Sequence, residues 1–447
     1  MESGFKELLS ESIGPEAASR ALDALGGQPS VSVRLNPSKS PEGGLPFEGE
    51  KVPWSPFGYF LAERPQFSLD PLFHVGAYYV QDSSAMFAGE VFRRILKEFR
   101  GQEVLKVLDL CAAPGGKSTD ILSSLRQERE GGYFLISNEV SAPRASALCE
   151  NLARWGDEAV AVTSSDPSAF GKFPGSFDVI LADVPCSGEG MFRKDEEALR
   201  QWSEGNVMLC QGRQRRILSA VWPALREGGF LIYSTCTFNH FENDDNVRWA
   251  SETLGAEVCD IEADYEGLLR TSCGVSLVPG FVRGEGQYVA LLRKPGGPSK
   301  GSGRTRAIKS EIKNVYLESE VAIVGKGGVF VALPPSSSAL SPLLENLRPL
   351  RSGLAVGSLK GSDFVPHADL ALAASLRDQA FPSHEAGLAQ ALAFLRRETL
   401  SLPGAPLGYM LIKYRGLGLG FVKNLGPRAN NLLPPSRRLR IQSNTIL

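Results

Sequence analysis

Two cysteines stand where a thiol could do chemistry, because each follows a short apolar run that predicts a strand. Cys186 ends the segment 183–186 (Asp-Val-Pro-Cys), and Cys236 lies in the segment 234–237 (Ser-Thr-Cys-Thr). A cysteine at an arbitrary position is usually an inert, small hydrophobic residue. Two thiols at the ends of neighbouring strands of one sheet would instead project into one cleft. The pattern therefore indicates a pair of functional cysteines in an active site, and the thiolate is the nucleophilic form of cysteine.

A turn of small residues joins another predicted strand to a predicted helix in the segment 109–119 (Asp-Leu-Cys-Ala-Ala-Pro-Gly-Gly-Lys-Ser-Thr). The start of a helix after such a turn offers backbone N–H groups and a favourable dipole to a polar ligand. A triphosphate-binding P-loop is excluded, because Cys111 replaces its first glycine and Pro114 lacks a backbone donor. Small side chains here would instead let a methionine moiety lie against bare backbone.

Acidic residues follow the next two predicted strands. Glu139 comes 23 residues after Gly116, a spacing that suits an acid binding both hydroxyls of a ribose. Asp166 follows the third strand, where it could bind an adenine amino group. Each acid alone is more often a loop residue or a helix cap. At successive strand ends they favour a nucleoside cofactor, and together with the turn they predict S-adenosylmethionine.

These groups match what methylation of cytosine at C5 requires. That carbon is too weakly nucleophilic to react unaided, and addition of a thiolate at C6 turns the ring into a reactive enamine. An acid that binds N3 stabilises the adduct, and a proton acceptor completes the cycle. Asp183, at the end of its predicted strand, is the best candidate for the N3 contact. The target base must be flipped out or unpaired, and the residues alone leave open which cysteine attacks.

The elements around these residues predict a mostly parallel, doubly wound α/β sheet. Five short apolar runs read as strands, at 104–110, 133–137, 159–163, 177–182 and 230–233, and the segments 142–155 and 196–225 are long enough for helices. Ligands bind at the carboxyl ends of strands in such sheets. The candidate residues lie at those ends.

The flanking regions differ from this pattern and predict separate domains. Residues 1–100 mix helical and turn-like stretches with an alternating strand at 30–37, and we expect an α+β extension that binds RNA. A Gly- and Pro-rich linker at 296–305 separates the catalytic domain, 101–295, from the C-terminal region, 306–447. That region is expected to form a small α+β or barrel-like module, with hairpins at 315–333 and 408–423 and a helix at 368–376.

Composition excludes several classes of protein. Of the 447 residues 43% are hydrophobic and 22% charged, no apolar run is long enough for a membrane span, and residues 1–7 lack the order of a signal peptide. The seven cysteines include no CxxC pair and no Cys/His cluster, so we expect no disulfide framework, no metal site and a reduced, cytoplasmic setting. The cysteines outside the predicted pair are interpreted as packing residues (Cys111, Cys149, Cys210, Cys259 and Cys273).

The net charge of −2 hides an asymmetry. Residues 301–447 contain 18 Lys and Arg against 9 Asp and Glu, and residues 411–447 contain seven basic residues and no acid. A basic terminal module on an acidic body favours a polyanionic partner. A solvated basic face without a partner fits the charge alone equally well.

The motifs together resemble the Nop/Sun family of RNA cytosine-C5 methyltransferases, in particular its bacterial members that act on 16S ribosomal RNA. The resemblance covers roughly residues 30–295 and rests on the segments Leu108–Thr119, Asn138–Arg144, Asp178–Asp195, Gly228–Thr237 and His74–Met86. It implies a Rossmann-like class I methyltransferase fold. Less specific matches at 350–357 and 420–423 imply a PUA-like RNA-binding module.

The resemblance also implies roles that spacing leaves open. In that family the nucleophile is the cysteine of the Thr-Cys motif, here Cys236, while Cys186 assists product release. One departure is Phe241, because relatives often carry an acidic residue at this position, next to Glu242. The departure weakens any role assigned to a pair of acids at positions 241 and 242. The expected cofactor contacts are Cys111, Ala112, Ala113, Pro114, Gly115, Gly116, Lys117, Glu139, Arg144, Asp166 and Asp183.

Two alternatives remain at this stage. The same catalytic domain could methylate transfer RNA or DNA, although the Thr-Cys motif and the basic module favour RNA. The other alternative is a ribosome-assembly factor that binds RNA without catalysis. The presence of Cys186, Cys236 and Asp183 argues against it. We expect a monomer whose partner is 16S rRNA or the small ribosomal subunit.

Overall fold

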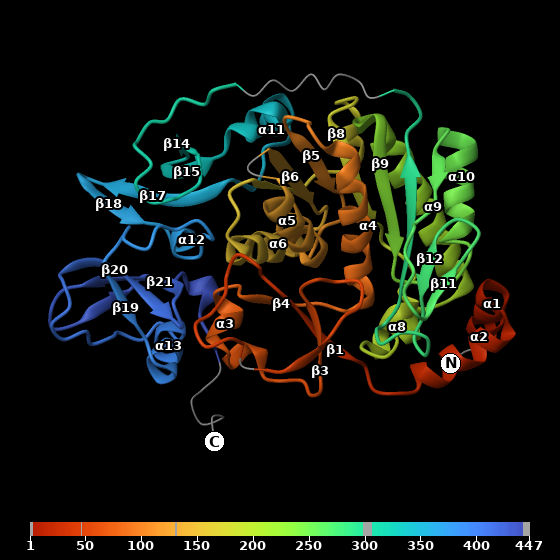
Figure 1. Cartoon of the computed structure of the whole chain (residues 1–447), viewed down its shortest axis with the longest axis horizontal. Helices are drawn as coiled ribbons and strands as arrows, with labels where there is room; N and C mark the ends of the chain where they lie inside the picture. The colour runs from red at the N-terminus through yellow and green to blue at the C-terminus, as the bar shows by residue number, and fades with distance from the viewer. Residues whose placement is uncertain (1–2, 46, 130–131, 298–305, 441–447) are drawn as a thin grey trace.

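The structure, a computed structural model, describes residues 3–45, 47–129, 132–297 and 306–440 (Figure 1). From position 298 onward the predicted linker lies outside these ranges, as does the end of the basic tail from position 441. Within the described ranges, no helix has the length and apolar character that crossing a membrane requires.

A parallel sheet forms the centre of the molecule, as the alternation of apolar runs and helices predicts. Its strands are almost completely buried on both faces, which explains why they read as continuous apolar runs. In space β8 and β6 flank β5, β7 follows β6, β9 follows β8, and all four pairings are parallel. The strands are β5 (Leu105–Asp109), β6 (Tyr133–Asn138), β7 (Val160–Thr163), β8 (Phe177–Asp183) and β9 (Leu225–Thr235).

Antiparallel strands extend the sheet beyond β9. The next strand, β13, pairs with β9 from Tyr288↔Thr235 to Arg293↔Phe230 and continues the sheet into a short meander. The sheet is therefore mixed, with a parallel core, and the predicted doubly wound fold is confirmed. These outer strands are β10 (Glu257–Cys259), β11 (Leu268–Arg270), β12 (Val275–Leu277) and β13 (Gln287–Arg293).

Helices cover the two faces of the sheet (Figure 1). The predicted helix 142–155 is present, whereas the segment 196–225 divides into two helices and the start of β9. The break occurs at Ser203, whose hydroxyl accepts a hydrogen bond from the N–H of Asn206 and caps the second helix. The helices are α4 (Phe87–Ile95), α5 (Gly116–Glu128), α6 (Ala142–Trp155), α7 (Ser168–Gly171), α8 (Glu196–Gln201), α9 (Glu204–Val221) and α10 (Asp244–Leu254).

The N-terminal region is an α+β unit. Its antiparallel sheet has the order β2-β3-β1-β4, and its two N-terminal helices pack against Phe192, Trp202 and Val278 of the central part. The predicted strand at 30–37 is present as β1. The elements are α1 (Ser3–Ile13), α2 (Pro15–Leu25), β1 (Val31–Leu35), β2 (Gly49–Lys51), β3 (Gly58–Leu61), α3 (Pro71–His74) and β4 (Tyr78–Val80).

The C-terminal region contains two four-stranded sheets, with the orders β14-β15-β17-β18 and β19-β20-β21-β22. Both predicted hairpins are present; the predicted helix is shorter than expected, and two further helices, α11 and α13, lie in stretches for which no helix was predicted. The elements are β14 (Ala322–Lys326), β15 (Val329–Leu333), α11 (Ser341–Leu347), β16 (Arg351–Ser352), β17 (Leu354–Lys360), β18 (Asp363–Pro366), α12 (Ala368–Ala371), β19 (Ser383–Glu385), α13 (Leu388–Leu395), β20 (Gly408–Tyr414), β21 (Leu417–Asn424) and β22 (Ala429–Asn431).

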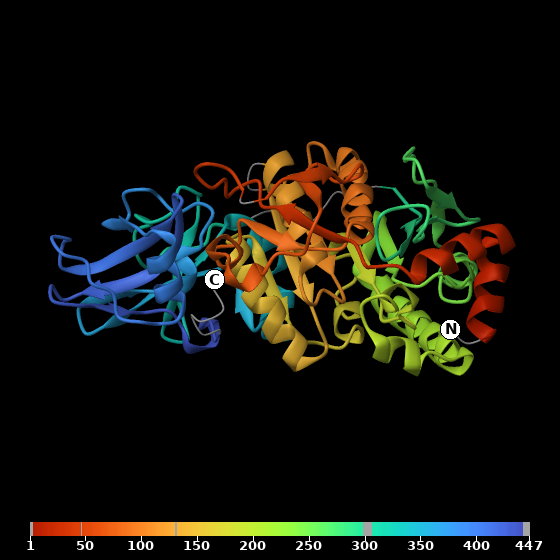
Figure 2. The same cartoon turned by 90° about the horizontal axis from the view of Figure 1, so that it is seen from below.

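This C-terminal region is docked on the rest of the chain and forms one end of the molecule, opposite α1 and α2 (Figures 1 and 2). Strand β16 extends the central sheet by pairing antiparallel with β7, through Arg351↔Val162 and Ser352↔Ala161. A shared hydrophobic cluster also joins Val33 and Tyr78 of the N-terminal region to Phe394 and Ile412. The three parts therefore form one packed unit.

Candidate active site

The two predicted cysteines lie side by side. Strands β8 and β9 run parallel and pair through Asp183↔Ser234, so the turns that follow them leave the sheet at the same edge. Their thiols come together there, with 3.3 Å between Cys186 Sγ and Cys236 Sγ. Neither cysteine is in a disulfide, and both are partly exposed. The convergence on which the sequence interpretation depends is thus present in the fold.

The two cysteine turns are tied to each other by hydrogen bonds. The Gly190 N–H donates to the Cys236 carbonyl at 2.8 Å, and the Ser187 and Thr237 hydroxyls lie 3.0 Å apart. The buried Glu189 carboxylate accepts hydrogen bonds from the N–H groups of Phe238 and Asn239 and from the indole of Trp202. These contacts fix the distance between the two thiols.

A second buried acid, Glu242, supports the Cys186 turn from behind. Its carboxylate accepts hydrogen bonds from the Ser187 N–H at 3.0 Å, the Gln214 amide at 2.6 Å and the Asn239 amide at 2.9 Å. Burial raises the pKa of Glu242, and these donors oppose the shift. The neighbouring Phe241 packs instead with the cluster formed by the N-terminal helices. The side chain of Glu242 is therefore occupied in holding the turn.

Asp183 lies at the centre of a network that sequence analysis predicts only in part. Its Oδ2 accepts a hydrogen bond from Lys117 Nζ at 2.8 Å, while its Oδ1 accepts from the Ser234 hydroxyl at 2.5 Å and from the Gln287 amide at 3.1 Å. Burial alone would lower the pKa of the Lys117 ammonium, but the charge of Asp183 and their hydrogen bond raise it above its usual value. This ion pair links the start of α5 directly to the end of β8.

The environment of Cys186 differs from that of an ordinary cysteine. The hydrogen bond with Cys236, together with burial, raises the pKa of the Cys186 thiol well above its usual range. Cys186 therefore keeps its proton near neutral pH. A thiolate at Cys236 would raise the pKa of the Lys117 ammonium, which lies near the thiol pair.

The small-residue turn between β5 and α5 has the shape of a cradle. Gly115 adopts a φ of 113°, a backbone conformation that favours glycine, and an added Cβ would meet Leu148 at 3.2 Å. Side chains of α6 hold the turn from outside: Arg144 donates to the Ala113 carbonyl and Asn151 to the Pro114 carbonyl, both at 2.8 Å. From Ala112 to Gly116 the turn carries only the apolar side chains of alanine and proline besides its backbone.

Asp109, the last residue of β5, lies beneath this turn. Its Oδ2 accepts a hydrogen bond from the Ser118 hydroxyl at 2.6 Å, whereas its buried Oδ1 has no partner among the described residues. Burial raises the pKa of Asp109 to about 7, although the Ser118 hydrogen bond opposes the shift. Cys111 lies close to Asp109. Burial, together with the charges of Asp109, Asp183 and Glu139, raises the pKa of the Cys111 thiol.

The two predicted nucleoside-binding acids differ in their surroundings. Glu139 is buried at the end of β6, where its carboxylate accepts a hydrogen bond from the Ser141 N–H at 2.9 Å and pairs with Arg144 at 3.4 Å. Asp166 is exposed, and its Oδ1 accepts hydrogen bonds from both the N–H and the hydroxyl of Ser168. Those hydrogen bonds lower the pKa of Asp166. Glu139 is thus linked to the turn through Arg144, whereas Asp166 lies on the surface.

Sequence analysis missed four side chains of this site: Ser234, Gln287, Glu189 and Gln214. Ser234 is part of the Ser-Thr-Cys-Thr segment, so its position next to Asp183 follows once β8 and β9 are known to pair in register. Gln287 begins the antiparallel strand β13, whose place beside β9 has no signal in the local sequence. Glu189 and Gln214 act through contacts across loops and helices, which spacing does not predict.

Comparison with protein families agrees with this architecture. The family model for the 16S rRNA methyltransferase RsmB/F matches residues 95–293. The model for the N-terminal domain of 16S rRNA methyltransferase RsmF matches residues 2–83, and that for the RsmF PUA domain matches residues 381–439. The matches follow one another along the chain in the order of the three regions seen in the fold.

Individual relatives agree with the family matches, and solved structures agree with the fold. The chain is 31% identical to the ribosomal RNA small subunit methyltransferase F of Cronobacter sakazakii and 28% identical to that of Shewanella loihica, over 86% of this chain and 83% of each relative. A methyltransferase homolog from Pyrococcus horikoshii shares the fold with a TM-score of 0.54 at 24% identity, over 66% of this chain and 95% of that protein. The NSun6 protein of the same organism, solved with SFG, has a TM-score of 0.55 at 19% identity, over 66% of this chain and 99% of that protein.

The resemblance to bacterial enzymes of 16S ribosomal RNA that the motifs predict is confirmed by these matches, as is the predicted PUA module. The paired cysteine turns and the cradle lie within the region that the catalytic family model covers. The chain belongs to the 16S rRNA methyltransferase RsmB/F family and carries the N-terminal and PUA domains of the RsmF type.

Proposed function

We propose that this protein forms 5-methylcytidine in 16S rRNA, with Cys236 as the covalent nucleophile and S-adenosylmethionine as the methyl donor. The observation that carries the proposal is the 3.3 Å approach of the two thiols beside Asp183, which is itself ion-paired to Lys117 of the cofactor turn. One edge of the sheet thereby holds a nucleophile, an acid and a cradle. Cytosine-C5 chemistry needs all three.

The residues of the cradle fit S-adenosylmethionine, which supplies an electrophilic methyl group when bound. The methyl side chains and bare backbone of the turn suit a methionine moiety, and the unpartnered Oδ1 of Asp109 adds a buried acceptor beneath it. Glu139 would accept hydrogen bonds from the ribose, supported by Arg144, and Asp166 would face the adenine. The residues proposed to line the methionine part are Cys111, Ala112, Ala113, Pro114, Gly115, Gly116 and Lys117.

The protein's own side chains then divide the work on the cytosine. Cys236 loses its thiol proton and adds through its sulfur to C6, N3 takes up a proton as electron density collects there, and the Asp183 carboxylate accepts a hydrogen bond from that N3–H. Lys117, Ser234 and Gln287 hold Asp183 in place. After methylation solvent water accepts the C5 proton, the electrons of the C5–H bond form the C5=C6 double bond, and the bond between C6 and the sulfur of Cys236 breaks. Cys186, which keeps its proton, is placed to protonate the departing thiolate at 3.3 Å.

RNA binding is assigned to both flanking regions, residues 1–100 and 306–447, around the catalytic domain 101–295. The basic C-terminal part is suited to phosphate contacts. We retain a monomer, a cytoplasmic location and the absence of a metal as predictions. The small ribosomal subunit is the proposed partner.

The test is transfer of labelled methyl groups from S-adenosylmethionine to 16S rRNA and to assembled small subunits, followed by bisulfite mapping of the product. We expect label in cytosine of ribosomal RNA. Label in transfer RNA alone would overturn the assignment of the substrate, and no transfer to any RNA would favour the non-catalytic assembly factor.

Substitutions at the two cysteines test their separate roles. Cys236→Ala should abolish transfer while sparing cofactor binding, and Cys186→Ala should accumulate a covalent protein–RNA adduct. Cys259→Ala provides a matched control, since Cys259 is a half-buried thiol on the edge strand β10. Free turnover by Cys186→Ala without an adduct would show that the roles are misassigned.

A further inference from the structure

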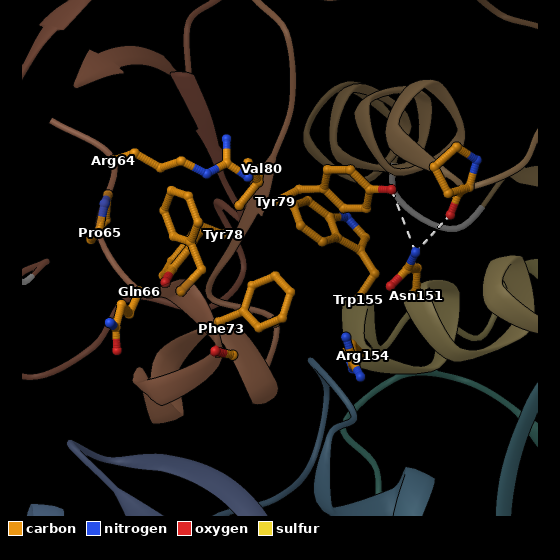
Figure 3. A pocket seen from close by; sticks show the side chains of 14 residues that line it. Arg64, Pro65, Gln66, Phe73, Tyr78, Tyr79, Val80, Asn151, Arg154 and Trp155 are labelled. Atoms are coloured by element: carbon orange, nitrogen blue, oxygen red, sulfur yellow. Dashed lines mark hydrogen bonds between the residues drawn. The ribbon is translucent and has the colours of Figure 1, made fainter. Parts of the chain in front are cut away.

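A cavity of about 800 Å³ lies between the N-terminal region and helix α6, on the outer side of the cofactor turn (Figure 3). None of the proposed catalytic or ribose-binding side chains lines it, and Pro114 is the one lining residue that it shares with the cofactor turn. Its volume falls within the range of roughly 300–1,000 Å³ typical of ligand pockets. It is lined by Arg64, Pro65, Gln66, Phe67, Ser68, Phe73, Gly76, Tyr78, Tyr79, Val80, Pro114, Asn151, Arg154 and Trp155.

The lining combines aromatic rings with positive charge. Five of its fourteen residues are aromatic, two are arginines and none is acidic. Figure 3 shows the rings of Phe73, Tyr79 and Trp155 around the cavity, with Arg64 and Arg154 on opposite sides of it. Aromatic rings beside guanidinium groups are what proteins present to unpaired nucleotides, since the base stacks on a ring and the phosphate pairs with an arginine.

Both arginines are free to meet an anion. Arg154 lies 5.4 Å from the centre of the Phe73 ring and Arg64 lies 5.7 Å from that of Phe67, and within the described ranges neither pairs with a carboxylate. Glu150, whose charge acts on Arg154, is paired instead with Arg437 at 2.7 Å. The local positive charge is therefore not neutralised by the protein itself.

The pocket is also fixed to the proposed active site. The Asn151 amide donates both to the Pro114 carbonyl at 2.8 Å and to the Tyr79 hydroxyl at 3.4 Å, so one side chain joins the pocket wall to the cofactor turn. On the N-terminal side, the Tyr78 hydroxyl is held by Asp70 at 2.7 Å. These hydrogen bonds hold the walls of the pocket in place without a ligand. A ligand bound in the pocket would lie directly behind the cofactor turn.

We infer that this pocket binds an unpaired nucleotide of the substrate RNA outside the target cytosine, with its base against the rings and its phosphate between Arg64 and Arg154. The inference rests on the proposed function, because it takes RNA as the substrate. It gives the N-terminal region a direct part in recognising RNA, next to the catalytic domain. A small apolar molecule would use the rings but would leave both guanidinium groups without a partner.

Paired variants test the inference through affinity. Arg64→Gln with Arg154→Gln should raise both the Kd for RNA and the KM by about tenfold or more and leave kcat unchanged, because two phosphate contacts are lost. Phe73→Leu, which keeps apolar bulk but removes the ring, should raise Kd by about tenfold. Arg100→Gln is the matched control, since Arg100 is an exposed arginine near the amino end of β5, away from the carboxyl edge.

Photo-crosslinking locates the contact independently of turnover. RNA carrying 4-thiouridine at unpaired positions should crosslink to peptides that contain residues 64–80 or 151–155, and the arginine variants should lose that crosslink. Unchanged Kd and KM in all the variants, or crosslinks confined to other peptides, would overturn the inference. Both Kd and crosslinks are measured without methyl transfer, so wild-type protein that binds RNA here but transfers no label would contradict the proposed function and leave the pocket intact.

Discussion

Ser234→Ala removes one hydroxyl from the proposed active site without disturbing its packing. The Ser234 side chain is fully buried, and its hydroxyl donates to Asp183 Oδ1 at 2.5 Å. Alanine fits the same space, so the substitution deletes a hydrogen bond and adds no atom. Ser234 is a positioning residue, because it acts on the cytosine only through Asp183.

The size of the effect follows from the contacts that remain. A hydrogen bond to a charged group contributes about 1.5–3 kcal/mol, and each 1.36 kcal/mol changes a rate about tenfold. Gln287 still donates to the same oxygen at 3.1 Å, and Lys117 still pairs with the other. We therefore expect the lower end of that range, a fall of roughly tenfold in the single-turnover rate of methyl transfer.

The assay is single-turnover methylation of saturating RNA with saturating S-adenosylmethionine, alongside cofactor affinity and thermal unfolding. Cofactor affinity and Tm should change little, because Ser234 is not among the proposed cofactor contacts. Ser276→Ala is the control, a buried serine on β12 of the same sheet that should leave the rate unchanged. Equal rates for wild type and Ser234→Ala would refute the role given to Asp183.

Three further predictions concern the supports of the site. Glu242→Ala should lower the free energy of unfolding in urea by about 3–5 kcal/mol, because three buried donors lose their acceptor; the exposed Glu252→Ala should not, and an equal loss in both would contradict this. Asp109, whose pKa burial raises from 3.8 to about 7, contributes stability that is complete below pH 3.8 and lost as pH rises through 7. Without cofactor, Asp109→Asn should therefore flatten the decline of stability between those pH values, and an unchanged profile would refute the assignment. Gly156→Ala should loosen the docked C-terminal region and speed its proteolysis, since the added Cβ would collide with the Leu372 carbonyl at a φ of +81°; unchanged protection would contradict this.

The parallel core was predictable because burial on both faces leaves an unbroken apolar run in each strand. These apolar runs identified β5 to β9. Because Cys186 follows the end of β8, they also predicted that Cys186 lies at the carboxyl edge of the sheet. The meeting of Cys186 with Cys236 required only that β8 and β9 be neighbours, an assumption that the pairing bears out. Sequence therefore predicted the residues that lie at strand ends.

The remaining features depend on contacts that local sequence does not record. Strand β16 has two residues, too few for a period, yet it joins the C-terminal region to β7. Ser203 divides a segment that reads as one helix, because its hydroxyl caps the second half. Gln287 reaches Asp183 from an antiparallel strand, and Phe241 packs against the N-terminal helices; both positions follow from tertiary packing.

The identity of the nucleophile is tested most directly by trapping it. RNA that carries 5-fluorocytidine at the methylated position cannot lose the C5 substituent as a proton, so the attacking sulfur stays bonded to C6. Digestion of the complex formed with S-adenosylmethionine, followed by mass spectrometry of the nucleotide-bearing peptide, should place the bond on Cys236. A bond on Cys186, or no covalent complex with an RNA that the protein methylates in its unfluorinated form, would contradict the mechanism.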